Sequence, residues 1–182
     1  MGISTLGIDV SENLVRVGHS AGADGADFAI AEAATLPLKD SSVDLVVSIA
    51  ALHHLKIDKA LAEWRRVTAH RGHLLLAEPN SLNPIAALGR KFFPLETHTS
   101  GEKPFSPQEL REALVRNRWL IQVWDSQIVL SFAVSRMLKL LEASDNVSRT
   151  FAKLLNPLES LADRIPLARK LGWILLCVAE KG

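Results

Sequence analysis

The sequence has few features that would tie the protein to a membrane, a nucleic acid or an oxidising compartment. Its single cysteine, Cys177, cannot form an intramolecular disulfide, and it lies in an apolar run where it should pack as a small apolar residue. The 21 basic and 20 acidic side chains give a formal net charge of +1, so no strong field favours nucleic acid. No apolar run reaches the roughly 20 residues that cross a bilayer, and no basic-then-apolar leader opens the chain. These absences predict a cytoplasmic protein without a transmembrane segment.

The composition that is present fits one globular domain over residues 1–182. Of the 182 residues, 48% are hydrophobic and 23% are charged, which is enough for a sizeable core. Residues 43–49, VDLVVSI, are rich in β-branched side chains, as expected of a parallel strand that is covered on both faces. Ligands of such sheets bind beyond the carboxyl ends of the strands, so a small-molecule site is expected between Ser48 and His54.

Strands and helices are predicted to alternate along the rest of the chain. Ser11 and Asp58 should cap helices, and Ser106 with Glu109 forms a capping box before a helix that should run to about Arg118. Residues 18–25 hold three glycines and no apolar periodicity, which predicts a loop. The further predictions are strands at 5–10, 28–31, 73–80, 119–124 and 172–180, a crossover helix ending at 70–72, and two helices within 128–170.

Two acidic residues follow predicted strands, and each has two interpretations. Asp9 could accept hydrogen bonds from both hydroxyls of a ribose, or it could join Ser11 in satisfying free amides at the start of a helix. Glu32 could accept from the exocyclic amino group of a base while the Ala33 amide donates to a ring nitrogen. Alternatively, Glu32 is a solvated loop residue.

Four segments, taken in order, resemble a known family. They are GIDVS at 7–11, EAATLP at 32–37, VDLVVS at 43–48 followed by LHHL at 52–55, and RGHLLLAEP at 71–79. In order and spacing they resemble the class I S-adenosylmethionine-dependent methyltransferases that act on small molecules. The resemblance implies a Rossmann-like α/β sheet with helices on both faces, mostly parallel with an antiparallel final strand.

The resemblance also implies roles for individual residues. The implied cofactor-binding residues are Asp9 and Val10 at the ribose, Glu32 and Ala33 at the adenine, and Ser48 and Ile49 at the methionine arm. The family usually has aspartate at the position of Glu32. No metal site is predicted.

A base helps methyl transfer when the acceptor is a hydroxyl. The candidates are His54 and His98, and His53 and Glu78 are also able to move a proton. The resemblance implies that His53 and His54 are largely structural, with one ring hydrogen-bonded near the next helix.

One part of the family pattern is absent. The family begins with a strand and a glycine-rich turn, about G-x-G-x-G, whose bare backbone lets the cofactor approach closely. Only six residues precede Gly7, so we expect a chain truncated at its amino end that lacks the first strand. In the family this strand lies between the strands that correspond to residues 5–10 and 43–49. These two strands should therefore pair directly or leave unpaired edges, through which the protein could form oligomers.

Two regions are expected to contribute to the acceptor side. Residues 81–105 should form a variable acceptor or lid loop, and residues 128–170 a helical insertion before the last strand. The apolar faces of that insertion could be core, could line an apolar acceptor pocket, or could rest on a membrane surface.

Three functions stay open. The first is S-adenosylmethionine-dependent methyl transfer to a small-molecule acceptor. The second is a non-catalytic remnant that acts as a binding or partner module, which the missing glycine turn favours. The third, a nicotinamide-dependent oxidoreductase, shares the acidic residue at position 9 but requires G-x-G-x-x-G and leaves residues 32–37 unexplained.

Overall fold

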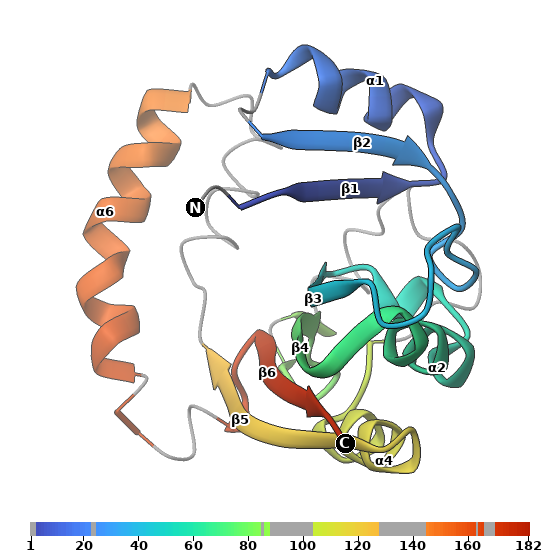
Figure 1. The fold of residues 1–182 in the computed structure, drawn as a ribbon. Helices are drawn as coiled ribbons and strands as arrows, with labels where there is room; N and C mark the ends of the chain where they lie inside the picture. Colours follow the sequence, from blue (N-terminus) through green and yellow to red (C-terminus); the bar gives the residue numbers. More distant parts are fainter. Residues whose placement is uncertain are drawn as a thin grey trace.

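A computed structural model describes residues 3–22, 25–84, 86–87, 104–127, 145–162, 164–165 and 170–182. Strands and helices alternate, as the sequence predicts (Figure 1). The amino-terminal elements are β1 (Thr5–Asp9), α1 (Glu12–Ser20), β2 (Ala26–Ile30), β3 (Val43–Ile49), the 3-10 turn η1 (Leu52–His54) and α2 (Ile57–Val67). The remaining elements are β4 (Thr68–Pro79), α4 (Pro107–Arg116), β5 (Trp119–Gln127), α6 (Asp145–Ala162) and β6 (Ile174–Lys181).

The described strands form two sheets instead of one. β1 pairs with β2 in parallel, whereas a second sheet has the order β3, β4, β6, β5. In this second sheet β3 and β4 are parallel, and β6 runs antiparallel to β4 and β5. Figure 1 shows the β1–β2 pair beside α1 and separate from the four-stranded sheet. No ladder joins β1 to β3 in the described chain, so the expectation of unpaired edges at these strands is confirmed.

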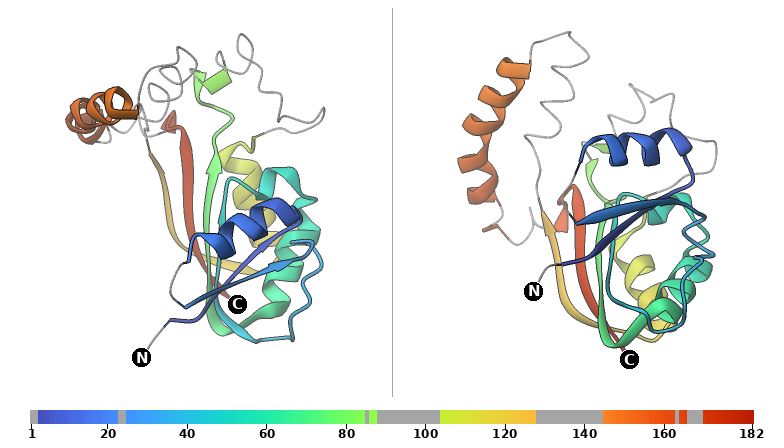
Figure 2. Two further views of the ribbon diagram at one scale, coloured as in Figure 1. Left: turned by 90° about the horizontal axis from the view of Figure 1, so that it is seen from above. Right: turned by 45° about the horizontal axis from the view of Figure 1, so that its top comes forward.

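The hydrophobic core lies on one face of the four-stranded sheet, where α2 and α4 lie together (Figure 2). In α2, the apolar residues Ala60, Leu61, Trp64 and Val67 recur at helical spacing, and each is at most 4% exposed. Ala60, Leu61 and Trp64 form one cluster with buried residues of the sheet, of α4 and of the loops, namely Ala34, Leu52, Leu74, Leu76, Leu110, Ala113, Leu114, Trp119, Leu175, Cys177 and Ala179. Cys177 is buried as expected, and this burial raises the pKa of its thiol to about 11.

The opposite face of β3 is open to solvent. Leu45, Val47 and Ile49 are 52%, 53% and 68% exposed. Alternate residues of a strand point to the same face, so these three side chains form one apolar stripe. The prediction that both faces of this strand are covered is therefore wrong, because the described helices that pack in the core, α2 and α4, lie on the other face of the sheet.

Two helix boundaries differ from the predictions. α1 continues to Ser20, so Gly18 lies within the helix and not in a loop. A Cβ at Gly18 would come within 2.6 Å of the Phe28 ring, so this glycine permits close packing of α1 on β2. The crossover helix α2 ends at Val67, several residues early, because Thr68 already pairs with Val43 as part of β4.

The predicted caps have different outcomes. The capping box of Ser106 and Glu109 is present, and α4 ends at Arg116. Asp58 does not cap α2, because its carboxylate instead accepts hydrogen bonds from Asn117 and Arg116, which lower its pKa.

The carboxyl-terminal third is described in part. α6 begins at Asp145, where a polar break between two helices was expected, and residues 128–144 lie outside the described residues. No helix in the described ranges is long and apolar enough to span a bilayer. β6 is the last strand of the chain and runs antiparallel to its neighbours, as predicted, and it lies between β4 and β5 in the sheet.

The exposure of β3 leads to a test by substitution. We predict that Val47→Thr changes the free energy of unfolding by less than about 0.5 kcal/mol, because Val47 is half exposed. The control Val67→Thr buries a hydroxyl at a fully buried position and should cost roughly 1–3 kcal/mol. Urea unfolding followed by circular dichroism measures both. Equal losses in the two variants would show that this face of β3 is covered in solution.

Candidate functional site

The predicted cofactor residues lie at the carboxyl ends of three strands, as expected. Asp9 ends β1, and Glu32 follows β2 by two residues. The parallel register joins these two ends, since the Ala31 amide donates to the Asp9 carbonyl at 3.1 Å. Ser48 and Ile49 end β3, in the other sheet. Asp9 and Glu32 therefore follow the ends of two paired strands. Ser48 and Ile49 belong to the other described sheet, which does not pair with β1.

Asp9 holds the start of α1. Its Oδ1 accepts a hydrogen bond from the Ser11 amide at 2.8 Å, and Ser11 Oγ accepts from the Leu14 amide. The structure therefore shows the second interpretation of Asp9, in which it satisfies a free amide at the start of a helix. Among the described residues no hydrogen bond uses Asp9 Oδ2, which stays available to a ligand. The neighbouring Val10 side chain is 65% exposed.

Glu32 and Ala33 form a turn in which hydrogen bonds orient both backbone carbonyls. The Thr35 amide donates to the Glu32 carbonyl at 3.0 Å, and the Trp64 indole Nε1 donates to the Ala33 carbonyl at 2.9 Å. The Glu32 side chain is exposed. In the part of the chain that the structure describes, the Ala33 amide makes no hydrogen bond.

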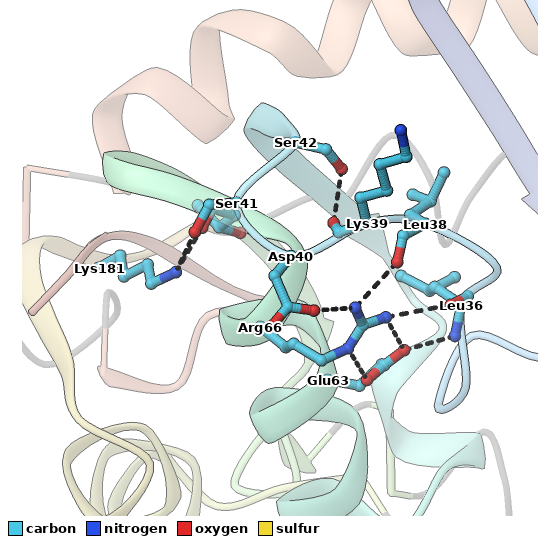
Figure 3. Close-up of polar contacts among 10 residues, drawn as sticks. Leu36, Leu38, Lys39, Asp40, Ser41, Ser42, Glu63, Arg66 and Lys181 are labelled. Atoms are coloured by element: carbon cyan, nitrogen blue, oxygen red, sulfur yellow. Dashed lines mark hydrogen bonds and ion pairs between the residues drawn. The ribbon is translucent and has the colours of Figure 1, made fainter.

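Two charged residues of α2 hold the loop that follows, in the arrangement drawn in Figure 3. Arg66 donates to the carbonyls of Leu36 (3.1 Å) and Leu38 (2.8 Å) and to the Asp40 carboxylate (2.6 Å). Glu63 accepts from the Leu36 amide at 2.6 Å and from the Arg66 guanidinium at 2.7 and 2.8 Å. The Arg66 hydrogen bonds lower the pKa of Glu63, and those of Glu63 and Asp40 raise the pKa of Arg66.

This loop attachment could not be predicted from the sequence. Glu63 and Arg66 lie off the apolar face of the helix, so the apolar pattern indicates no role for them. Their opposite charges at a spacing of three residues could indicate an ion pair. That spacing carries no information about the loop more than 25 residues earlier.

A buried carboxylate fixes the turn that follows β3. Glu78, near the end of β4, is fully buried, and its Oε1 accepts from the amides of Ala51 (3.1 Å) and Leu52 (2.9 Å). Its Oε2 lies 2.8 Å from His53 Nδ1. Ala50 has a φ of +50°, which a residue with a Cβ rarely adopts, so this turn is strained. Both Glu78 oxygens are engaged within the protein, which assigns Glu78 to holding the turn.

The two histidines of this turn are stacked. The rings of His53 and His54 lie 4.0 Å apart, and His54 is exposed. The ring of His53 is thus hydrogen-bonded, and its partner is the Glu78 carboxylate near the end of β4. His98, the other candidate base, lies outside the described residues.

Ser48 carries a buried hydroxyl with an unusual environment. The residue is 6% exposed, and its Oγ has no hydrogen-bond partner among the described residues. Burying an unpaired hydroxyl costs about 1–3 kcal/mol, so such groups are rare outside strained or functional sites. Ile49, the next residue, instead points to the open face and is 68% exposed.

Two buried asparagines that the sequence analysis did not identify lie beyond the end of β4. Asn80 Nδ2 donates to the Gly172 carbonyl at 2.8 Å, and Asn83 Nδ2 donates to the Leu171 carbonyl at 2.6 Å. They fix the chain where it enters β6, next to the same edge of the sheet. The residues next to Asn80 and Asn83 in the sequence do not indicate these distant hydrogen-bond partners.

A shallow hollow of about 400 Å³ lies elsewhere, at the amino ends of β1 and β2. Its lining residues are Ile3, Ser4, Gly25, Ala26 and Asp27. None of them carries a predicted role, and the hollow is at the opposite end of these strands from Asp9. We therefore place the candidate site at the carboxyl ends.

Comparison with known proteins connects this edge to a family. Residues 1–76 match the family described as a methyltransferase domain. This part of the chain is therefore similar to a methyltransferase domain. The matched region holds Asp9, Glu32, Ser48 and the turn that Glu78 fixes, so the candidate site lies almost entirely within the part of the chain that resembles this family.

Two curated relatives and a solved structure agree with the match. The chain is 38% identical over 72 residues to a malonyl-[acyl-carrier protein] O-methyltransferase of Methylococcus capsulatus, covering 38% of this chain and 26% of the relative. It is 36% identical over 85 residues to a ubiquinone/menaquinone biosynthesis C-methyltransferase of Acidiphilium cryptum, covering 43% and 34%. These matches span about a quarter and a third of the relatives.

The fold itself is that of a methyltransferase. A methyltransferase of Haloferax volcanii, solved in complex with the Trm112 activator, superimposes with a TM-score of 0.66. The alignment covers 98% of this chain and 71% of the other, at 18% sequence identity. The expected Rossmann-like architecture is thereby confirmed.

The attachment of the loop to α2 leads to a pH-dependent prediction. Because the pKa of Glu63 is lower in the folded protein, its contribution is present above the unfolded pKa, about 4.3, and is lost as the pH falls through the folded value. We expect Glu63→Gln to reduce the free energy of unfolding by roughly 1–2 kcal/mol at pH 7. At pH 3 the difference should be much smaller. Urea unfolding at the two pH values measures it, and a pH-independent difference would contradict the assignment.

Proposed function

We propose that the chain is part of an enzyme that transfers a methyl group from S-adenosylmethionine to a small-molecule acceptor. The observation that carries the proposal is the set of polar groups left for a ligand beyond β1 and β2. These groups are Asp9 Oδ2, the exposed Glu32 carboxylate and the Ala33 amide without an internal partner. They fit a nucleoside, because a carboxylate suits ribose hydroxyls, and an acceptor beside an amide donor suits the edge of adenine.

The residues of β3 would complete the site. Ser48 and Ile49 would border the methionine arm, and the unpaired Ser48 hydroxyl is a group that a ligand or a rearrangement could satisfy. The proposal keeps the single-domain organisation, the cytoplasmic location and the acceptor role of residues 81–105 that the sequence predicts. One relative is named an O-methyltransferase and the other a C-methyltransferase, so we assign no atom type to the acceptor.

Methyl transfer requires the protein to position the cofactor and the acceptor, more than it requires a reactive protein side chain. S-adenosylmethionine supplies an activated methyl group when it is bound. The residues of this chain would then hold the cofactor, align the acceptor with the methyl group and exclude water, without a covalent protein nucleophile. If the acceptor loses a proton, the proposed bases are His54, which is exposed, and His98.

A second function is favoured by the divided sheet. Within the described residues, β1 and β3 each present an unpaired edge, and β3 adds the exposed stripe of Leu45, Val47 and Ile49. Unpaired edges of this kind bind further strands. A module that binds a partner or a second copy through these edges is therefore the alternative to catalysis.

Isothermal titration with S-adenosylmethionine tests the first function. We expect binding with a Kd below about 100 μM, and Asp9→Ala should weaken it more than about tenfold. Asp9→Asn can still accept from Ser11 but loses the second carboxylate oxygen, so it should weaken binding with little loss of stability.

Asp27→Ala is the control for this titration, because it removes an exposed carboxylate near the other end of the β1–β2 pair. It should leave the affinity unchanged. Normal affinity in both Asp9 variants would remove Asp9 from the site. Absence of binding to the parent chain would contradict cofactor binding by this chain and leave the partner module.

A further inference from the structure

Trp64 connects the core of the protein to the turn at Glu32 and Ala33. Its side chain is 4% exposed and packs in the core cluster, yet its indole N–H reaches the Ala33 carbonyl at 2.9 Å. Ala34, the next residue, is itself in that cluster at 6% exposure. The backbone of the turn is therefore held against the core at its second residue.

The direction of the Ala33 amide follows from its neighbours. In a trans peptide the carbonyl of one residue and the N–H of the next point in opposite directions. The Glu32 carbonyl points into the turn, where it accepts from the Thr35 amide, so the Ala33 N–H points out of it. The Trp64 hydrogen bond fixes the following peptide. Together the two bonds fix both peptides that flank the Ala33 Cα.

The loop beyond the turn is fixed as well. Glu63 accepts from the Leu36 amide, and Arg66 donates to the Leu36 carbonyl. Three consecutive attachments, to Ala33, to Leu36 and to Leu38, thus come from a single turn of α2. The outward amide of Ala33 is thereby set before any ligand arrives, which lowers the cost of binding.

We propose that Trp64 is a positioning residue for base recognition, acting through its hydrogen bond to the Ala33 carbonyl. The inference rests on the proposed function, in which the Ala33 amide and the Glu32 carboxylate read the adenine. It adds that the selectivity for adenine depends on a side chain of α2 that does not itself touch the ligand. A purely structural Trp64 would affect stability without affecting selectivity.

The test compares two ligands that differ only in the base. S-inosylhomocysteine has an oxo group in place of the exocyclic amino group of S-adenosylhomocysteine, and a ring N–H in place of the acceptor nitrogen. The parent chain should therefore prefer S-adenosylhomocysteine. In Trp64→Phe the ratio of the two dissociation constants should fall by about five- to tenfold, the effect of one hydrogen bond of ordinary net strength.

Trp119→Phe is the matched control. Trp119 is also buried, at 1% exposure, and its Nε1 also donates to a backbone carbonyl, that of Leu61 within α2. It should lose similar stability while keeping the ratio of dissociation constants. Glu63→Ala is a second variant for the case that Trp64→Phe does not fold. It releases the Leu36 amide without changing the core and should also lower the ratio.

Each outcome supports or overturns the inference. A lowered ratio in the Trp64 and Glu63 variants, with an unchanged ratio in Trp119→Phe, supports it. If Trp64→Phe weakens both ligands equally, Trp64 only stabilises the core and the inference is wrong. If the parent binds both ligands equally well, the base is not read by this turn, and the inference is also wrong.

Failure of the proposed function can be told apart. If the parent binds neither ligand, the proposed function fails, and amide hydrogen exchange without ligand decides the remaining claim. Trp64→Phe should then accelerate exchange of the Thr35 and Leu36 amides relative to Trp119→Phe. Equal exchange in the two variants would overturn the positioning role.

Discussion

The hydrogen bonds of Arg66 and Glu63 with the backbone of Leu36 and Leu38 attach the loop between the two described sheets to α2. No ladder connects β1 to β3 in the described residues, so the attachment of this loop contributes to how the first sheet is held relative to the second. Charge-assisted hydrogen bonds suit this task, because they are shorter and about twice as strong as neutral ones. The Arg66 side chain is one-third exposed and that of Glu63 15% exposed, so water screens the pair only in part.

This connection also decides the geometry of the candidate site. Asp9 and Glu32 belong to the β1–β2 side, whereas Ser48 and Ile49 belong to β3. A ligand that contacts both sets has to span the unpaired edges. Its binding geometry therefore depends on the loop that α2 holds, and only indirectly on the sheet. In an unbroken sheet, ladder hydrogen bonds would fix these strand ends relative to each other.

The local parts of the fold could be predicted from the sequence. The bounds of β3, the capping box at Ser106 and the antiparallel last strand follow from patterns of neighbouring residues. The split between β1 and β3 was one of two expectations, and the sequence could not choose between them, because pairing depends on whether two distant edges can approach. The coverage of β3 was mispredicted because it also depends on distant elements, namely those that pack on the face of the strand. A β-branched run describes what a strand prefers, and it does not say which elements are present to cover it.

The site residues show the same division. Asp9 and Glu32 could be proposed from the sequence because acidic side chains that follow strands suit a nucleoside, although each also has an ordinary interpretation. Trp64 could not, because its spacing with Leu61 and Val67 fully accounts for it as a core residue. Its hydrogen bond to a carbonyl 31 residues earlier depends on the tertiary fold. Glu78 was identified as a candidate base, and only its three hydrogen-bond partners show that it holds a turn.

The placement of buried polar groups gives an independent reason to regard the carboxyl edge as the functional one. Of the buried polar residues, Ser48, Glu78, Asn80 and Asn83 lie at or just beyond the ends of β3 and β4. Burying a carboxylate is costly unless hydrogen bonds compensate, and Glu78 uses its bonds to hold a turn that already contains a strained alanine at position 50. A sheet can fold without such groups, since apolar residues would fill the same space at lower cost. Their concentration at one edge therefore reflects a requirement on the backbone there, and a defined backbone is what recognition of a small ligand needs.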